Sequence, residues 1–194
     1  MPRPSQEDAI LTAAMSCFAE LGYDATRIKH IAAHAGVSEG ALYRHYPSKE
    51  AIAQALYRHY LGEYVAKLRA IVAAEGSARD CLRDVIRLSL ASYRANPAAI
   101  TFVLIRQPTF MGGLPRETVY PLDLIETVMR GGQEDGSIRD GQPNLLAAIF
   151  FGCLLRPLIV SQLAQPGALD LLHDTRHDRV IIDAAWAAVA HSWE

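Results

Sequence analysis

Residues 35–50 read AGVSEGALYRHYPSKE, and this stretch decides the fold predicted for the N-terminal part of the chain. Gly36 can adopt the left-handed backbone conformation that ends a helix, and Ser38 offers an oxygen that caps the next helix. Pro47 then ends that helix, and Ser48 caps the one that follows. Two short helices joined by a glycine-containing turn form a helix-turn-helix, whose second helix enters the major groove of DNA. The stretch therefore predicts a DNA-binding unit.

The sequence from Phe18 to Ala51 resembles the N-terminal DNA-binding domain of TetR-type transcriptional regulators. The residues that carry the resemblance are Phe18, Gly22-Tyr23, Thr26, Ile31-Ala32, Ala35-Gly36-Val37-Ser38, Leu42-Tyr43, His45 and Ser48-Lys49-Glu50. Beyond them the chain agrees with the family in length and helical character only. The resemblance implies an all-α protein of about nine helices, with a three-helix head joined by a long helix to a helical effector-binding and dimerisation domain. We expect the boundary between residues 1–48 and residues 49–194.

The composition supports a helical protein, but the net charge does not indicate a nucleic acid as partner. The chain has 194 residues, of which 51% are hydrophobic, and a formal net charge of −2. Up to residue 50, five Lys or Arg residues face six Asp or Glu residues. Phosphate contacts dominate the affinity of most DNA-binding proteins, so attraction to DNA must come from local clusters of cations. We therefore expect one head to bind weakly and to depend on dimerisation.

Helical periodicity and breaker residues predict the remaining elements. A capping box at Ser5 starts the first helix, and Gly22 ends it. The expected helices cover residues 5–21, 26–35, 39–46, 49–74, 78–95, 98–107, 116–130, 144–164 with a kink or break at Pro157, and 178–192. Residues 108–115 and 131–143 are expected to be loops.

Two groups of residues are expected to contact DNA. By resemblance to the family, four match positions that contact phosphates, and a hydroxyl at a helix N-terminus favours a phosphate on physical grounds: Thr26, Tyr43, His45 and Lys49. Base reading would fall to the start of the third helix, assisted by the second: Ser38, Glu39, Gly40, Ala41 and Arg44, with Arg27 or Lys29. Arg44 can pair with guanine, and Glu39 can accept from cytosine. The alternative is that Arg44 and Glu39 lie in water or pair with each other.

Family members bind palindromic sites as two-fold dimers. The two C-terminal helices carry small residues that would allow close contact between copies, and an arginine that could pair with an acid of the other copy: Gly152, Arg156, Ala184 and Ala188. The alternative is that both helices only complete the core of a monomer.

The resemblance also implies a small-molecule effector, bound by the helices that follow the head. Candidate pocket residues are aromatic, flexible or basic: Tyr60, Tyr64, Tyr93, Phe102, Arg106, Phe110, Met111 and Tyr120. Each of the apolar ones could equally be ordinary core, and Arg106 could receive a ligand carboxylate or point to solvent. These observations predict a ligand-responsive repressor. The alternative is a TetR-like DNA-binding protein without an effector, either architectural or regulated by another protein.

Other functions find little support. The pairs His30 and His34, and His173 and His177, lie one helical turn apart, but neither forms the HExxH pattern of a zinc enzyme. Three distant cysteines without a CxxC motif are expected to be free thiols. We predict no enzyme, cofactor or metal. The apolar run from Leu145 to Leu155 is expected to be too short to span a membrane, so the predicted location is the cytoplasm.

Overall fold

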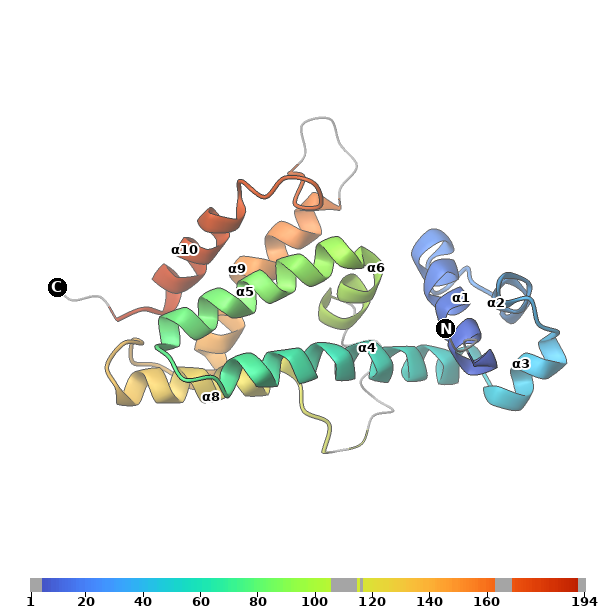
Figure 1. Ribbon diagram of the computed structural model, residues 1–194, viewed down its shortest axis with the longest axis horizontal. Coiled ribbons are helices and arrows are strands. Elements are labelled where there is room, and N and C mark those ends of the chain that lie inside the picture. Colours follow the sequence, from blue (N-terminus) through green and yellow to red (C-terminus); the bar gives the residue numbers. More distant parts are fainter. Residues whose placement is uncertain (1–4, 106–114, 116, 163–168, 192–194) are drawn as a thin grey trace. The chain divides into compact units, whose positions relative to one another are not determined.

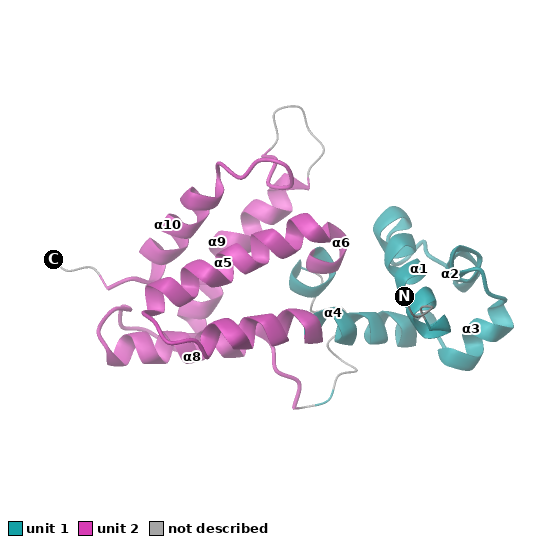
Figure 2. Ribbon diagram, viewed as in Figure 1, with its two compact units in different colours: residues 1–61, 101–116 teal, residues 62–100, 117–194 magenta. Residues whose placement is uncertain are grey.

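The computed structural model describes residues 5–105, 115, 117–162 and 169–191 (Figure 1). These residues contain nine α-helices, a π-helical turn and no β-strand beyond one isolated bridge between Ile138 and Ala190. The chain divides into two compact units (Figure 2): unit 1 comprises Met1–Leu61 and Thr101–Arg116, and unit 2 comprises Gly62–Ile100 and Glu117–Glu194. The all-α prediction is confirmed. The domain boundary expected after residue 48 stays a prediction.

Unit 1 contains three helices, the first half of a fourth and the π-helical turn: α1 (Gln6–Leu21), α2 (Ile28–Ala35), α3 (Glu39–His45), α4 (Lys49–Val72) and η1 (Thr101–Ile105). Ser5 caps α1 as expected, since its hydroxyl accepts from the backbone N–H of Asp8 and the Asp8 carboxylate accepts from Ser5. Packing of α1 against α2, and of α2 against α3, builds the head.

A cluster of apolar side chains forms the centre of unit 1. Ile10, Ile31, Leu42 and Ile52 come from four different helices, and none of them exposes any surface to solvent. Aromatic rings extend this core. The ring of Phe102 stacks on that of Phe18 with centroids 6.2 Å apart, and the edge of Tyr57 meets it at 6.1 Å.

Unit 2 contains the second half of α4 and five further helices: α5 (Ala78–Ala95), α6 (Pro97–Ile100), α8 (Pro121–Glu134), α9 (Pro143–Ser161) and α10 (Asp178–Val189). Central α9 packs against α8 and α10, and α5 packs against α8 and α10. An ion pair joins the end of α5 to the start of α10, because Arg94 donates to both carboxylate oxygens of Asp178 and its Nε donates to the carbonyl of Leu171 at 3.1 Å.

Several predicted helix bounds were wrong. Instead of 116–130, α8 covers Pro121–Glu134 and continues through Gly131 and Gly132. A Cβ at Gly132 would lie 2.5 Å from Cδ1 of Ile138, so glycine is required where the buried Ile138 side chain crosses the helix. The helix expected over 98–107 is a short α-helix followed by a π-helical turn, and its last two positions lie outside the described residues.

The helix α9 is longer than the apolar run that predicted it. It extends unbroken from Pro143 to Ser161 with Pro157 inside. By length and composition alone it could cross a membrane, a test that core helices of soluble proteins also pass. The expectation that this segment is too short was therefore wrong. One face of α9 is buried against α8 and α10, and the opposite face exposes apolar residues.

The buried Leu42 side chain tests the core of unit 1. Replacement by alanine removes apolar volume that cannot be refilled, so Leu42→Ala should lower the free energy of unfolding by about 2–5 kcal/mol. Leu21→Ala is the matched control, because Leu21 is 48% exposed and should change stability by less than about 0.5 kcal/mol. Urea unfolding followed by circular dichroism measures both. Equal losses in the two variants would contradict the packing described.

Candidate nucleic-acid interface

The turn between α2 and α3 has the geometry that the sequence predicts. Gly36 lies in the left-handed region with φ of 67°, and its N–H donates to the carbonyls of Ala32 and Ala33. Val37 donates to the carbonyl of Ala32 at 3.0 Å. The hydroxyl of Ser38 then accepts from the N–H of Ala41 at 3.1 Å and caps α3. The chain thus ends one helix and starts the next within a few residues, as a helix-turn-helix requires.

Contacts with α1 fix the far end of α3. The Tyr46 hydroxyl donates to the carboxylate of Glu7 at 2.9 Å, and its ring is 6% exposed. Burial, followed by this hydrogen bond, raises the pKa of Tyr46 well above its usual range. The neighbouring His45 places Nε2 3.0 Å from the side-chain oxygen of Gln6. Sequence analysis missed Gln6 and Glu7 as positioning residues, because no local pattern pairs side chains 39 positions apart.

Most of the predicted DNA-contacting residues share one property, which is exposure to solvent. Exposed members of the set are Arg27, Lys29, Ser38, Glu39, Gly40, Tyr43, Arg44 and His45. Tyr43 is 51% exposed, a high value for an aromatic side chain. A Cβ at Gly40 would meet nothing within 4 Å, so packing inside the chain does not require glycine there. That Gly40 lets DNA approach the α3 backbone closely stays a prediction.

Two residues of the set are buried, which corrects their expected roles. Thr26 is 1% exposed and its hydroxyl donates to the carbonyls of Gly22 and Cys17, at 2.7 and 3.0 Å. The N-cap of α2 is Arg27, so Thr26 is not the helix-terminal hydroxyl that was expected to favour a phosphate. Ala41 is 7% exposed and packs inside the head. The base-reading role expected for Ala41 therefore finds no support in the structure.

The Lys49 ammonium is occupied by the chain itself. Its Nζ donates to the carbonyls of Tyr23, Asp24 and Thr26 at 2.8, 3.3 and 3.0 Å, and it lies 4.4 Å from the centroid of the Tyr23 ring. An ammonium has three N–H donors, so these carbonyls use its whole capacity. We call this arrangement the Lys49 clamp. It joins the start of α4 to the turn between α1 and α2, which gives Lys49 a positioning role in place of the phosphate contact expected for it.

In the part of the chain that the structure describes, the cationic side chains on α3 and at the start of α2 are not neutralised by ion pairs. Arg27, Lys29 and Arg44 take part in no ion pair within the described residues, and no ion pair joins Arg44 to Glu39. The alternative in which Arg44 and Glu39 neutralise each other is therefore not what the structure shows. Exposed cations on two neighbouring helices are therefore available to attract phosphates, although the net charge of the chain is negative.

Comparison with known proteins agrees with this geometry. Residues 10–59 match the family model described as bacterial regulatory proteins of the tetR family. The transcriptional regulator RutR of Escherichia coli is 30% identical over 146 residues, which are 73% of this chain and 68% of that protein. The chain belongs to the TetR family.

Two further relatives extend the comparison of this TetR-family chain. The transcriptional repressor KstR2 of Rhodococcus jostii is 32% identical over 138 residues, 67% of this chain and 66% of that protein. The solved structure of the regulator FadR from Bacillus subtilis in complex with stearoyl-CoA has a TM-score of 0.73 at 19% identity, and covers 93% of this chain and 97% of that one. The last likeness shows a shared fold.

The residues predicted for an effector pocket are divided between the two units. Tyr60 and Phe102 belong to unit 1, whereas Tyr64, Tyr93 and Tyr120 belong to unit 2. Buried Tyr64 lies 2.6 Å from the Ser89 hydroxyl, and burial raises the pKa of Tyr64 to about 12. The Tyr93 hydroxyl lies 3.2 Å from that of Ser161. Arg106, Phe110 and Met111 lie outside the described residues. A pocket built from this set stays a prediction.

Of the two histidine pairs that could suggest a metal, His173 and His177 lie beside carboxylates. Nδ1 of His173 lies 3.1 Å from Asp170, and Nε2 of His177 lies 3.5 Å from Asp174. Within the described ranges, no three His, Cys, Asp or Glu side chains gather in a way that could hold a metal ion. Cys17, Cys81 and Cys153 are free thiols, as expected.

Replacing Lys49 distinguishes its role in the clamp from a role in phosphate contact. Lys49→Met removes three hydrogen bonds from a charged donor and should lower the free energy of unfolding by about 1.5–3 kcal/mol. Because no phosphate contact is lost, the slope of log Kd against log salt concentration for duplex DNA should not change. Denaturant unfolding and fluorescence anisotropy at several salt concentrations measure the two effects.

The control is Lys29→Met, which removes an exposed cation of α2. If Lys29 meets a phosphate, the salt slope should fall by about one while stability is unchanged. A reduced slope with unaltered stability in Lys49→Met would show that the clamp opens to bind DNA.

Proposed function

We propose that this TetR-family regulator is a repressor that binds a palindromic operator as a homodimer in the cytoplasm and is released by a small-molecule effector. The observation that carries the DNA-binding part is the exposed, uncompensated face of α3 and α2, held in place by buried contacts. Phosphates are met by Tyr43 and His45, together with Arg27 or Lys29. Bases are read by Arg44 and Glu39 from α3.

Dimerisation rests on the exposed apolar surfaces of the last two helices. On α9, Leu145 is 55% exposed and Ile149 is 40% exposed, and exposed Gly152 and Arg156 continue the same helical face. On α10, Val180 is 65% exposed, and Ala184 lies one turn further on. Isolated apolar residues are common on surfaces, but faces repeating over two adjacent helices favour contact with a second copy. We call these residues the α9–α10 face.

Effector control is supported by the relatives and by the course of α4. The FadR structure from Bacillus subtilis contains stearoyl-CoA. In the present chain α4 is one unbroken helix that starts at the Lys49 clamp and continues into unit 2. The protein can be in conformations that differ in the placement of α4. A ligand that binds one of these conformations more tightly than another would change the affinity for DNA by that difference in binding free energy. Stearoyl-CoA is the first probe to test for release of bound DNA.

Selection of bound sites from random duplex DNA tests the proposed base reading. The wild type should enrich a palindrome, and Arg44→Ala should relax the preference at one position of each half-site. Loss of a bidentate contact to guanine should reduce the difference in binding free energy between guanine and the other bases at that position by about 1–3 kcal/mol. Lys67→Ala is the control, because Lys67 is an exposed cation of α4 in unit 2. An unchanged preference in Arg44→Ala would assign the reading to other residues.

Sedimentation equilibrium tests the α9–α10 face. Leu145→Asp introduces a charge that association would bury, so it should shift the protein toward monomer and lower its affinity for a two-site operator. The matched control is Leu122→Asp on α8, since Leu122 is 37% exposed and lies outside the face. Equal behaviour of the two variants would place the dimer contact elsewhere.

A further inference from the structure

A cavity of about 300 Å³ lies between α5, α9 and α10, all within unit 2. Its apolar walls are Leu82 and Phe150, each 1% exposed, with the partly exposed Ile182 and Trp186. None of the residues predicted for the effector pocket lines it. Its volume is at the lower end of the range for small-molecule sites.

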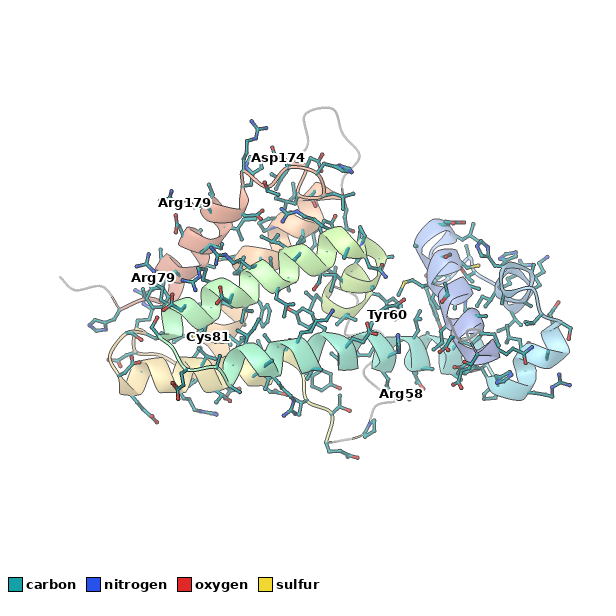
Figure 3. All side chains as sticks on the ribbon, in the orientation of Figure 1. Arg58, Tyr60, Arg79, Cys81, Asp174 and Arg179 are labelled. Atoms are coloured by element: carbon teal, nitrogen blue, oxygen red, sulfur yellow. The ribbon has the colours of Figure 1, made fainter. Side chains whose placement is uncertain are left out.

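Arg79 is one of four charged side chains that line this cavity, together with Asp80, Arg83 and Asp183. It comes from the first turn of α5, beside α10 (Figure 3), and its guanidinium carbon lies 5.8 Å from the centroid of the Trp186 ring. A guanidinium placed over an indole ring can still donate through its N–H groups, in a fork that matches a carboxylate. Among the described residues Arg79 makes no ion pair with any acid.

The other charges around the cavity compensate one another. Arg83 pairs with Asp80 and Asp84, and Asp84 also accepts from Arg87 at 3.4 Å. Asp183, the remaining acid in the wall, lies 3.5 Å from Nε of Arg179. Asp80, Asp84 and Asp183 therefore each pair with another arginine, and Arg79 is the charged residue of the wall that forms no ion pair within the described part of the chain.

We propose that this cavity is a binding site for a small aromatic carboxylate. The carboxylate pairs with the N–H edge of Arg79, and the ring lies against Trp186 and Ile182 with Phe150 at the base. The helices that line the site also carry the α9–α10 face, but the proposal does not depend on dimerisation or on DNA binding.

Calorimetric titration with 2-naphthoate tests the site. Naphthoate should bind the wild type, while neutral 2-naphthylmethanol and cationic 2-naphthylmethylamine should bind more weakly. Arg79→Gln should raise the Kd for naphthoate by about tenfold or more, the loss expected for hydrogen bonds to a charged group. Arg87→Gln is the matched control, because Arg87 is an exposed arginine of the same helix that does not line the cavity. Circular dichroism checks that both variants remain folded.

A second measurement localises the ligand. In Trp193→Phe protein, Trp186 is the sole tryptophan, so its indole N–H gives a single resonance that naphthoate should shift in a saturable way. Equal affinity of Arg79→Gln and Arg87→Gln would overturn the proposal. So would an unmoved indole resonance, tighter binding of the amine, or the absence of any binding heat.

Discussion

The position of α3 depends on contacts that the helix makes with the rest of unit 1. Its seven residues are too few to form a stable helix alone in water. Three features compensate: the Ser38 cap at its start, the buried Leu42 side chain at its middle, and the hydrogen bond from Tyr46 to Glu7 just after its end. The surface offered to DNA is therefore only as well defined as the core beneath it.

Because the head must be held together by its own contacts, its polar side chains fall into two groups, those that bind other parts of the head and those left exposed for DNA. Polar groups that the sequence suggested for phosphate, the Thr26 hydroxyl and the Lys49 ammonium, satisfy backbone carbonyls instead. Fewer cations are then left for DNA in a head whose acids outnumber its bases. A single head with few phosphate contacts binds weakly, so the proposed function requires two heads on one operator. In the proposed function, the exposed α9–α10 face would bring the two heads together.

The sequence predicted best those helix ends that depend on hydrogen bonds between residues close together in the chain. Ser5, Gly36 and Ser38 end or start helices through bonds to residues within five positions, and all three act as expected. Prediction failed where a distant contact decides. Thr26 is buried by a hydrogen bond to the carbonyl of Cys17, nine positions away, although its type suits a cap. Gly131 and Gly132 are typical of a loop, yet they lie inside α8, where the side chain of Ile138 fills the space that Gly132 leaves. Arg79 and Trp186 come from helices far apart in sequence, so no local pattern joins them.

Hydrogen–deuterium exchange with and without duplex DNA recovered by site selection tests whether α3 is the helix that binds DNA. The amides of residues 38–45 should exchange more slowly on binding, because DNA covers the exposed face of α3. The amides of residues 82–90 in α5 should be unaffected. Protection confined to unit 2, with unchanged exchange in α3, would contradict the assignment of α3 as the helix that reads DNA.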